Sequence, residues 1–310
     1  MRTIGFGFLF FSLALLSWAD TAPTLAERLG YKPGDRLLII NGDDAGMCHT
    51  ANEATIECLE QGLMTTSTVM VPCPWFNEIA DYSRRHPEKN FGVHLCHTCE
   101  WKPYRWGPVA PREQVPGLLD PAGYLWPSAE DVYAHAQPEE TLTEGRAQIK
   151  KALAAGMDIT HLDSHMGTLQ LNPAFLEVYA KLAVEFRLPL RMASQETMAR
   201  FGFPKLRGEL AAKGIVFSDY FVYDELKDEK AGVKPFWASV LKQLKPGVTE
   251  LYIHAGKPTD ELKAITGSWR TRSEEFETFT HDPEIRAIIA DQKIIRIGYR
   301  PLRDLQRQEK

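Results

Sequence analysis

Seven side chains suited to metal binding or acid–base catalysis follow short apolar segments of this sequence. They are Asp43, Asp44, His94, His161, Asp163, His165 and His254. Carboxylate oxygens and imidazole nitrogens together are ligands for zinc, manganese or magnesium. The pattern predicts one polar cluster that binds a divalent cation, in which the remaining groups transfer protons.

Asp43 and Asp44 are adjacent carboxylates at the end of an apolar run. Two such groups repel each other, and burying both costs free energy unless a cation or a proton offsets the charge. A metal bound to one of them leaves the other available as a base. The alternative is an ordinary turn in which an aspartate caps the following helix.

The segment His161-Leu162-Asp163-Ser164-His165 alternates polar and other residues. On a strand, residues two apart point the same way, so the two histidines and the aspartate share a face. This favours one histidine as a metal ligand, with Asp163 orienting a neighbouring group. The alternative is a pair of histidines that cap a loop. Taken singly, His94 and His254 are typical of buried core histidines. Their positions at the ends of strands make them candidates for the site.

The elements that would position these residues alternate regularly. Helices are expected at 50–61, 77–86, 139–155, 173–185, 195–213 and 236–244. Apolar or β-branched strands are expected at 36–41, 66–71, 91–95, 159–164, 189–193, 215–217, 250–254 and 293–299. Such alternation predicts an α/β fold with largely parallel strands, in which the site lies at the carboxyl ends of the strands. Seven or eight units favour a single irregular (β/α) barrel; an open doubly wound sheet is the alternative.

The ends of the chain and one internal segment depart from this alternation. Residues 1–19 combine Arg2, an apolar run and small residues before Asp20, which predicts a signal peptide and a secreted or periplasmic protein. An uncleaved membrane anchor is the alternative. The segment 99–137 is rich in proline, glycine and aromatic residues, as functional loops often are. The tail 303–310 is expected to be solvated, and 20–310 is expected to form one domain.

Charge and motifs exclude several function classes. The net charge is −5 and no basic patch stands out, so nucleic acid is not expected as a partner. No second hydrophobic span follows the signal peptide, so no membrane association is expected after its cleavage. The nucleophile elbow, the P-loop and the dinucleotide-binding glycine motif are absent. The five cysteines favour buried thiols or one disulfide over a zinc site, because a second Cys-x-x-Cys pair is missing.

In combination, four motifs resemble those of the YdjC-like carbohydrate deacetylases, a family that includes chitooligosaccharide deacetylases. The motifs are Asn41-Gly42-Asp43-Asp44-Ala45-Gly46, Gly92-Val93-His94-Leu95, His161-Leu162-Asp163-Ser164-His165 and His254-Ala255-Gly256. The resemblance covers about residues 35–300. It implies an irregular (β/α) barrel and a divalent cation, magnesium or zinc, held by Asp44, His94 and His165.

The resemblance also implies the activity, which is removal of acetyl groups from carbohydrate. Asp43 would be the catalytic base and His254 the acid. Arg191 would steady developing charge or orient Asp43, or it would be an ordinary ion-pair partner. Within 99–137, the rings of Trp101, Tyr104 and Trp106 would either stack on sugars or pack the segment onto the barrel.

Two further functions remain open from the sequence. The same site serves a carbohydrate O-acetyl esterase, because amide and ester hydrolysis make the same demands on it. A non-catalytic secreted sugar-binding protein is the third reading, which the intact Asp43 and Asp44 disfavour. The substrate is expected to be an acetylated oligo- or polysaccharide, and the oligomeric state is left open.

Overall fold

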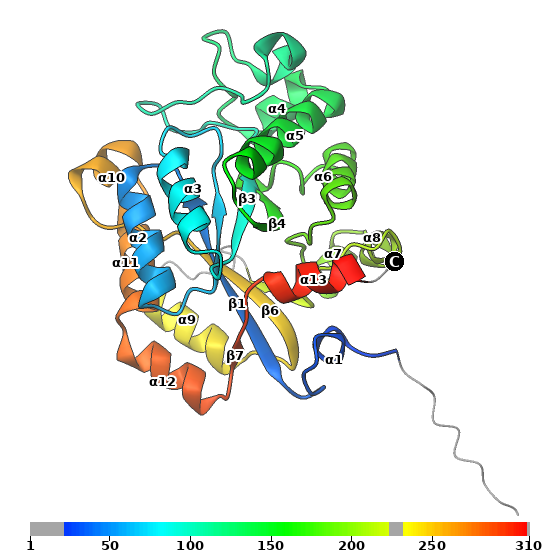
Figure 1. Ribbon diagram of the computed structural model, residues 1–310, viewed down its shortest axis with the longest axis vertical. Helices are drawn as coiled ribbons and strands as arrows, with labels where there is room; N and C mark the ends of the chain where they lie inside the picture. Colours follow the sequence, from blue (N-terminus) through cyan, green and yellow to red (C-terminus); the bar gives the residue numbers. More distant parts are fainter. Residues whose placement is uncertain (1–21, 223–231, 309–310) are drawn as a thin grey trace, which may run out of the picture.

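A computed structural model describes residues 22–222 and 232–308 (Figure 1). The expected signal peptide at 1–19 lies outside these residues. The strands are β1 (Arg36–Ala45), β2 (Thr66–Val69), β3 (Phe91–Leu95), β4 (Ile159–Ser164), β5 (Tyr220–Val222), β6 (Gly247–Ile253) and β7 (Ile295–Arg296). All the pairs among them are parallel, in the order β4-β3-β2-β1-β6-β5, and β7 also pairs with β1.

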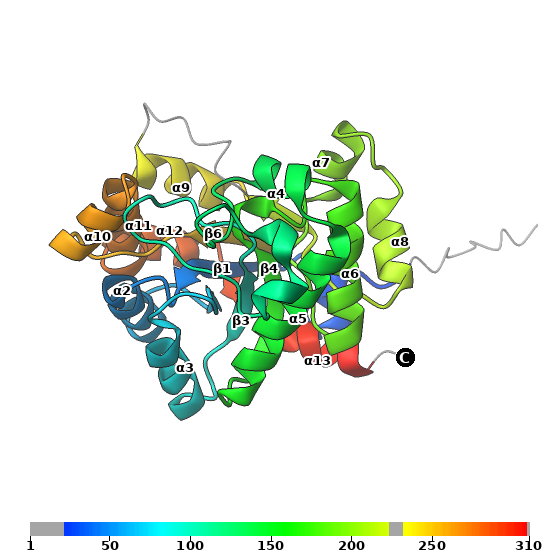
Figure 2. The ribbon, with the colours of Figure 1, turned by 90° about the horizontal axis from the view of Figure 1, so that it is seen from above.

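Thirteen α-helices surround this sheet in the described part of the chain. They are α1 (Leu25–Arg28), α2 (His49–Glu60), α3 (Phe76–Arg85), α4 (Ala129–His135), α5 (Pro138–Ala154), α6 (Pro173–Phe186), α7 (Gln195–Arg200), α8 (Leu206–Ala212), α9 (Val233–Lys242), α10 (Asp260–Ile265), α11 (Trp269–Thr280), α12 (Pro283–Asp291) and α13 (Arg300–Gln308). Seen from above, α2 and α3 flank the strands on one side and α5 and α6 on the other (Figure 2). Among the described residues, no helix has both the length and the apolar character needed to cross a bilayer.

The sheet curls into a partial barrel that two irregular segments complete. Leu190 forms an isolated parallel bridge with Leu162 of β4, and its N–H donates to the carbonyl of Val216 at 3.1 Å. Asp219 then donates to Val248 of β6 at 2.9 Å. The expectation of an α/β fold with an irregular barrel is therefore confirmed. Regular strands at 189–193 and 215–217 were wrong: the first segment pairs with β4 at the isolated bridge of Leu190, the second accepts a backbone hydrogen bond at Val216, and a regular strand follows later, as β5.

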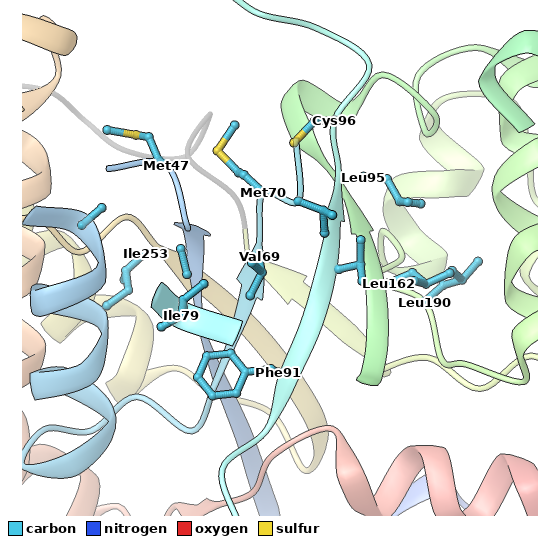
Figure 3. Close-up of a cluster of buried hydrophobic side chains, with 14 of the residues drawn as sticks. Met47, Val69, Met70, Ile79, Phe91, Leu95, Cys96, Leu162, Leu190 and Ile253 are labelled. Carbon is cyan, nitrogen blue, oxygen red and sulfur yellow. The ribbon is translucent and has the colours of Figure 1, made fainter. Parts of the chain in front are cut away.

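Two apolar clusters form most of the core of the barrel. The larger packs the outer face of the sheet against helices: in Figure 3, Val69, Ile79 and Phe91 lie together between the sheet and α3. The smaller lies among alternate residues of β1 and β6, where Leu37, Ile39, Val248, Tyr299 and Leu302 pack together. Because side chains alternate along a strand, Asn41 and Asp43 share the face of Leu37 and Ile39. The polar residues of the site therefore lie above an apolar plug.

Two expectations for irregular regions need correction. The tail 303–310 is not solvated throughout: Arg303 and Gln306 of α13 are buried, and the Gln306 side chain accepts from the N–H of Val216 at 2.8 Å. The segment 99–137 is fixed to α5, whose buried Glu144 accepts from the N–H groups of Val109 and Ala110 at 2.9 and 2.8 Å. It also contains α4 and two short 3₁₀ turns, Arg112–Gln114 and Pro116–Leu118. Both regions satisfy their polar groups through contacts distant in sequence, which local patterns do not reveal.

Candidate metal centre

A bulge at the end of β1 brings the adjacent side chains of Asp43 and Asp44 to the same site. The register between β1 and β2 shifts between Gly42 and Ala45, and Asp44 adopts a left-handed conformation with φ 67°. On a regular strand, Asp43 and Asp44 would point to opposite faces. A left-handed residue other than glycine costs about 1–3 kcal/mol and persists only where its surroundings hold it. Here an ion pair with Arg272 holds Asp44, at 2.6 Å from its Oδ2.

Three ligand atoms form a small triangle at the carboxyl ends of β1, β3 and β4. Asp44 Oδ1 lies 3.3 Å from His94 Nε2 and 3.5 Å from His165 Nδ1, and the two nitrogens are 3.1 Å apart. All three side chains are buried. Ligands about 2.0–2.1 Å from a tetrahedral ion lie about 3.3–3.4 Å from one another. The triangle has the size of one face of such a coordination sphere.

The second nitrogen of each histidine is held by a carboxylate. His94 Nδ1 lies 2.5 Å from Asp163 Oδ1, and His165 Nε2 lies 2.9 Å from Glu100 Oε2. A carboxylate fixes the ring proton on the nitrogen it faces, which leaves the other nitrogen with a free lone pair. Asp44 Oδ1 is buried and makes no hydrogen bond to any described residue. Three unshared lone pairs thus converge, and these residues fit a divalent cation.

The electrostatics of the cluster favour positive charge. Burial lowers the pKa of His94, but Asp163 and Asp44 outweigh burial and raise it to about 10. Burial also lowers the pKa of His165, but Glu100 and Asp44 outweigh burial and raise this pKa to about 9. If both histidines were protonated, however, the proton on His94 Nε2 and the proton on His165 Nδ1 would have to fit between these two nitrogens, which are 3.1 Å apart. A single cation satisfies the surrounding carboxylates without that conflict.

Asp43 lies beside the triangle and is held by Arg191. The Nη1 and Nη2 groups of Arg191 donate to the two Asp43 oxygens at 2.7 and 2.8 Å, and Asn41 Nδ2 donates to Oδ1 at 2.7 Å. Burial raises the pKa of Asp43, but Arg191 outweighs it and leaves the pKa at about 2. Asp43 is therefore ionised, as a proton acceptor must be. The same guanidinium lies 2.9 Å from Asp163, so it takes the place a cation would need between Asp43 and Asp163.

His161 and Asp163 share a face of β4 as expected, but they serve different neighbours. Asp163 contacts His94, whereas the ring of His161 stacks on Tyr299 and its Nε2 lies 3.2 Å from Asn41 Oδ1. Gly92 on β3 makes room for this ring, because a Cβ there would lie 2.6 Å from His161 Cε1. His161 thus supports the Asn41 side of Asp43 and does not contact the triangle.

His254 and the three predicted aromatic residues lie around the triangle. His254 Nε2 is 3.9 Å from Asp44 Oδ2, and the side chain is 25% exposed. Trp101 and Trp106 are 8% and 3% exposed and pack on each other and on His165. Tyr104 donates its hydroxyl to the Met47 carbonyl. The two tryptophans therefore pack the segment onto the barrel, and sugar stacking by the predicted aromatic residues stays a prediction.

Four residues of this site were not found from the sequence. Glu100 and Arg272 lie in regions without a periodic signal, and Tyr299 precedes an unexpected helix. Glu250 carried a usable signal, because Glu250 and His254 are four apart on a strand and must share a face. The five cysteines are buried free thiols, and neither group of residues able to hold a metal contains one.

The family follows from comparison with known proteins. A model of the YdjC-like protein family matches residues 37–291. The chain belongs to the YdjC-like family. A carbohydrate deacetylase of Thermus thermophilus is 34% identical over 277 residues, covering 86% of this chain and 94% of that protein. One from Brevibacillus brevis is 31% identical, covering 83% and 96%.

A solved protein structure has the same fold as this chain. A protein of Enterococcus faecalis V583 named for cellobiose-phosphate cleavage superposes with a TM-score of 0.74 at 28% identity. The match covers 86% of this chain and 99% of that one. The expected family is therefore confirmed.

Proposed function

We propose that this protein is a divalent-metal-dependent hydrolase that removes acetyl groups from carbohydrate, with N-acetylated sugar oligosaccharides as substrates. The observation that carries the proposal is the buried triangle of Asp44, His94 and His165, with 3.1–3.5 Å between ligand atoms. An ionised Asp43 lies beside it. Relatives named carbohydrate deacetylases support the choice of substrate class.

The residues divide the work of hydrolysis. When bound, a divalent cation activates water and polarises the acyl carbonyl. Asp43 accepts the proton of the attacking water, and Arg191 and Asn41 keep its carboxylate in place. His254 protonates the leaving amine, since its ring is partly exposed beside the cluster. Asp163 and Glu100 keep the imidazoles of the two ligand histidines in the required tautomer.

The nature of the cation and the cellular address are part of the proposal. Two imidazole nitrogens and one carboxylate oxygen suit zinc or magnesium, the metals that the family resemblance implies. Residues 1–19 are proposed to direct export, so the enzyme would meet its substrate outside the cytoplasm. Amino-terminal sequencing of the exported protein tests this, with a mature chain that begins near residue 20 as the expected result.

Acetate release tests the function directly. The mature chain is stripped with a chelator and assayed on acetylated chitooligosaccharides and on acetylxylan, with and without added Zn²⁺ or Mg²⁺. Asp43→Asn should lower kcat by about 10²-fold or more, because it removes the general base. Asp81→Asn is the matched control, since Asp81 pairs with Arg84 and Arg85 on the surface of α3.

Each outcome has a clear meaning. Metal-restored release from chitooligosaccharides that Asp43→Asn lacks is the expected result. Release from acetylxylan alone would show that the enzyme cleaves an ester bond and not an amide bond. A protein that binds metal yet releases no acetate from either substrate would refute the deacetylase assignment.

A further inference from the structure

Tyr299 is a buried residue beneath the site that the mechanism does not use. It lies between β7 and α13, is fully buried, and belongs to the apolar plug of the barrel. It also lies beyond residue 291, where the match to the family model ends. Its ring and its hydroxyl nevertheless both face polar residues that lead to Asp43.

The hydroxyl leads to Asp43 through two charged side chains. It donates to Glu250 Oε2 at 2.5 Å, and Glu250 Oε1 accepts from Arg191 Nε at 2.8 Å. Arg191 in turn donates to both oxygens of Asp43. Because one Glu250 oxygen takes Tyr299 and the other takes Arg191, both ends of this buried carboxylate are fixed. Without the hydroxyl, Glu250 Oε2 would lose this hydrogen-bond partner at a fully buried position. The Glu250 carboxylate would then rotate toward another donor.

The ring leads to Asp43 by a second path. It stacks on His161 with centroids 3.8 Å apart and planes within 6°. His161 Nε2 lies 3.2 Å from Asn41 Oδ1, which assigns the ring proton to Nε2 because the amide oxygen accepts. Asn41 then donates to Asp43 Oδ1. Tyr299 thus supports the two groups that hold the Asp43 carboxylate, Arg191 and Asn41.

We propose that Tyr299 is a positioning residue, whose hydroxyl fixes Glu250 and Arg191 and thereby sets the orientation of Asp43 toward the metal-ligand triangle. The inference rests on the proposed function in one respect, namely that Asp43 accepts a proton. Tyr299 touches none of the three ligand atoms and lies below the site. Its loss therefore affects the rate of the chemical step and leaves substrate and metal binding in place.

Tyr299→Phe tests the proposal, because it removes the hydroxyl and keeps the ring. We expect kcat to fall about tenfold, since small displacements of a reacting group cost this much or more. KM should stay within about twofold, and metal affinity measured by calorimetry should not change. Tyr82→Phe is the matched control: Tyr82 is also buried and donates to a glutamate, Glu60, at 3.1 Å, but it lies on α3 away from the triangle.

A crystal structure of Tyr299→Phe supplies a readout that does not depend on activity. Displacement of Arg191 from its two bonds to Asp43, with the fall in kcat, supports the proposal. A kcat within twofold of wild type, or a fall matched by Tyr82→Phe at equal loss of Tm, overturns it. If the wild-type enzyme releases no acetate, the proposed function fails, and the structure alone decides: an unchanged Arg191–Asp43 pair refutes positioning by Tyr299, and a displaced pair supports it.

Discussion

At the residue scale, the site places one carboxylate behind each ligand histidine, and Glu100 is the less protected of the two. Its side chain is 24% exposed, whereas Asp163 is fully buried and also accepts from Thr68 at 2.8 Å. Glu100 contacts His165 alone among the ligands, and it lies in the segment 99–137. This makes Glu100 a place where a substitution can test metal affinity with little disturbance of the barrel.

Glu100→Gln should weaken metal binding about 10- to 100-fold, the usual cost of altering a group behind a ligand histidine. The amide keeps the size of the side chain but loses the negative charge that makes His165 a stronger base. Calorimetric titration of the stripped protein with Zn²⁺ measures the change. Glu113→Gln serves as a control, because Glu113 is exposed on the same segment. Equal affinities in both variants would show that Glu100 does not support the ligand.

At the element scale, the strand ends explain why the sequence predicted the centre of the site but not its surroundings. Asp43, Asp44 and His94 lie in strands with clear apolar runs, and parallel strands bring their carboxyl ends together. Arg272 lies on α11, in a region where the pattern indicated no helix. The left-handed conformation of Asp44 could not be predicted either, because Arg272, which pairs with Asp44 there, is far away in sequence.

The helix α13 shows the same limit of local sequence patterns. The charged tail 303–310 was expected to be solvated, yet α13 buries Arg303 and Gln306 of that tail and places the preceding Leu302 in the apolar plug with Tyr299. Leu302→Ala should lower the free energy of unfolding by about 2–4 kcal/mol, as expected for a fully buried leucine. Gln308→Ala, at an exposed position of the same helix, should change it by less than about 0.5 kcal/mol. Denaturant unfolding measures both, and equal midpoints would contradict the packing of α13.

At the scale of the whole molecule, the barrel wall is closed by few backbone hydrogen bonds at one place, and buried carboxylates gather at the site. Between β4 and β5, the isolated bridge of Leu190 with Leu162 and a backbone hydrogen bond from Leu190 to Val216 continue the wall of the barrel. The triangle of ligand atoms joins β1, β3 and the turn after β4, the strand that borders this gap. A cation there would connect three parts of the sheet while neutralising a buried carboxylate.

Metal should therefore stabilise the entire fold. At a concentration one hundred times Kd, binding to the native state alone adds about 2.7 kcal/mol, which corresponds to a rise in Tm of roughly 4–5 °C for a chain of this size. Calorimetric scans of the stripped protein with and without Zn²⁺ measure the shift. His165→Ala should lose it, because a ligand is missing, whereas Asp43→Asn should keep it, because Asp43 lies beside the triangle, held by Arg191, and supplies none of its three ligand atoms. A shift that survives in His165→Ala, or that vanishes in Asp43→Asn, would place the cation elsewhere in the cluster.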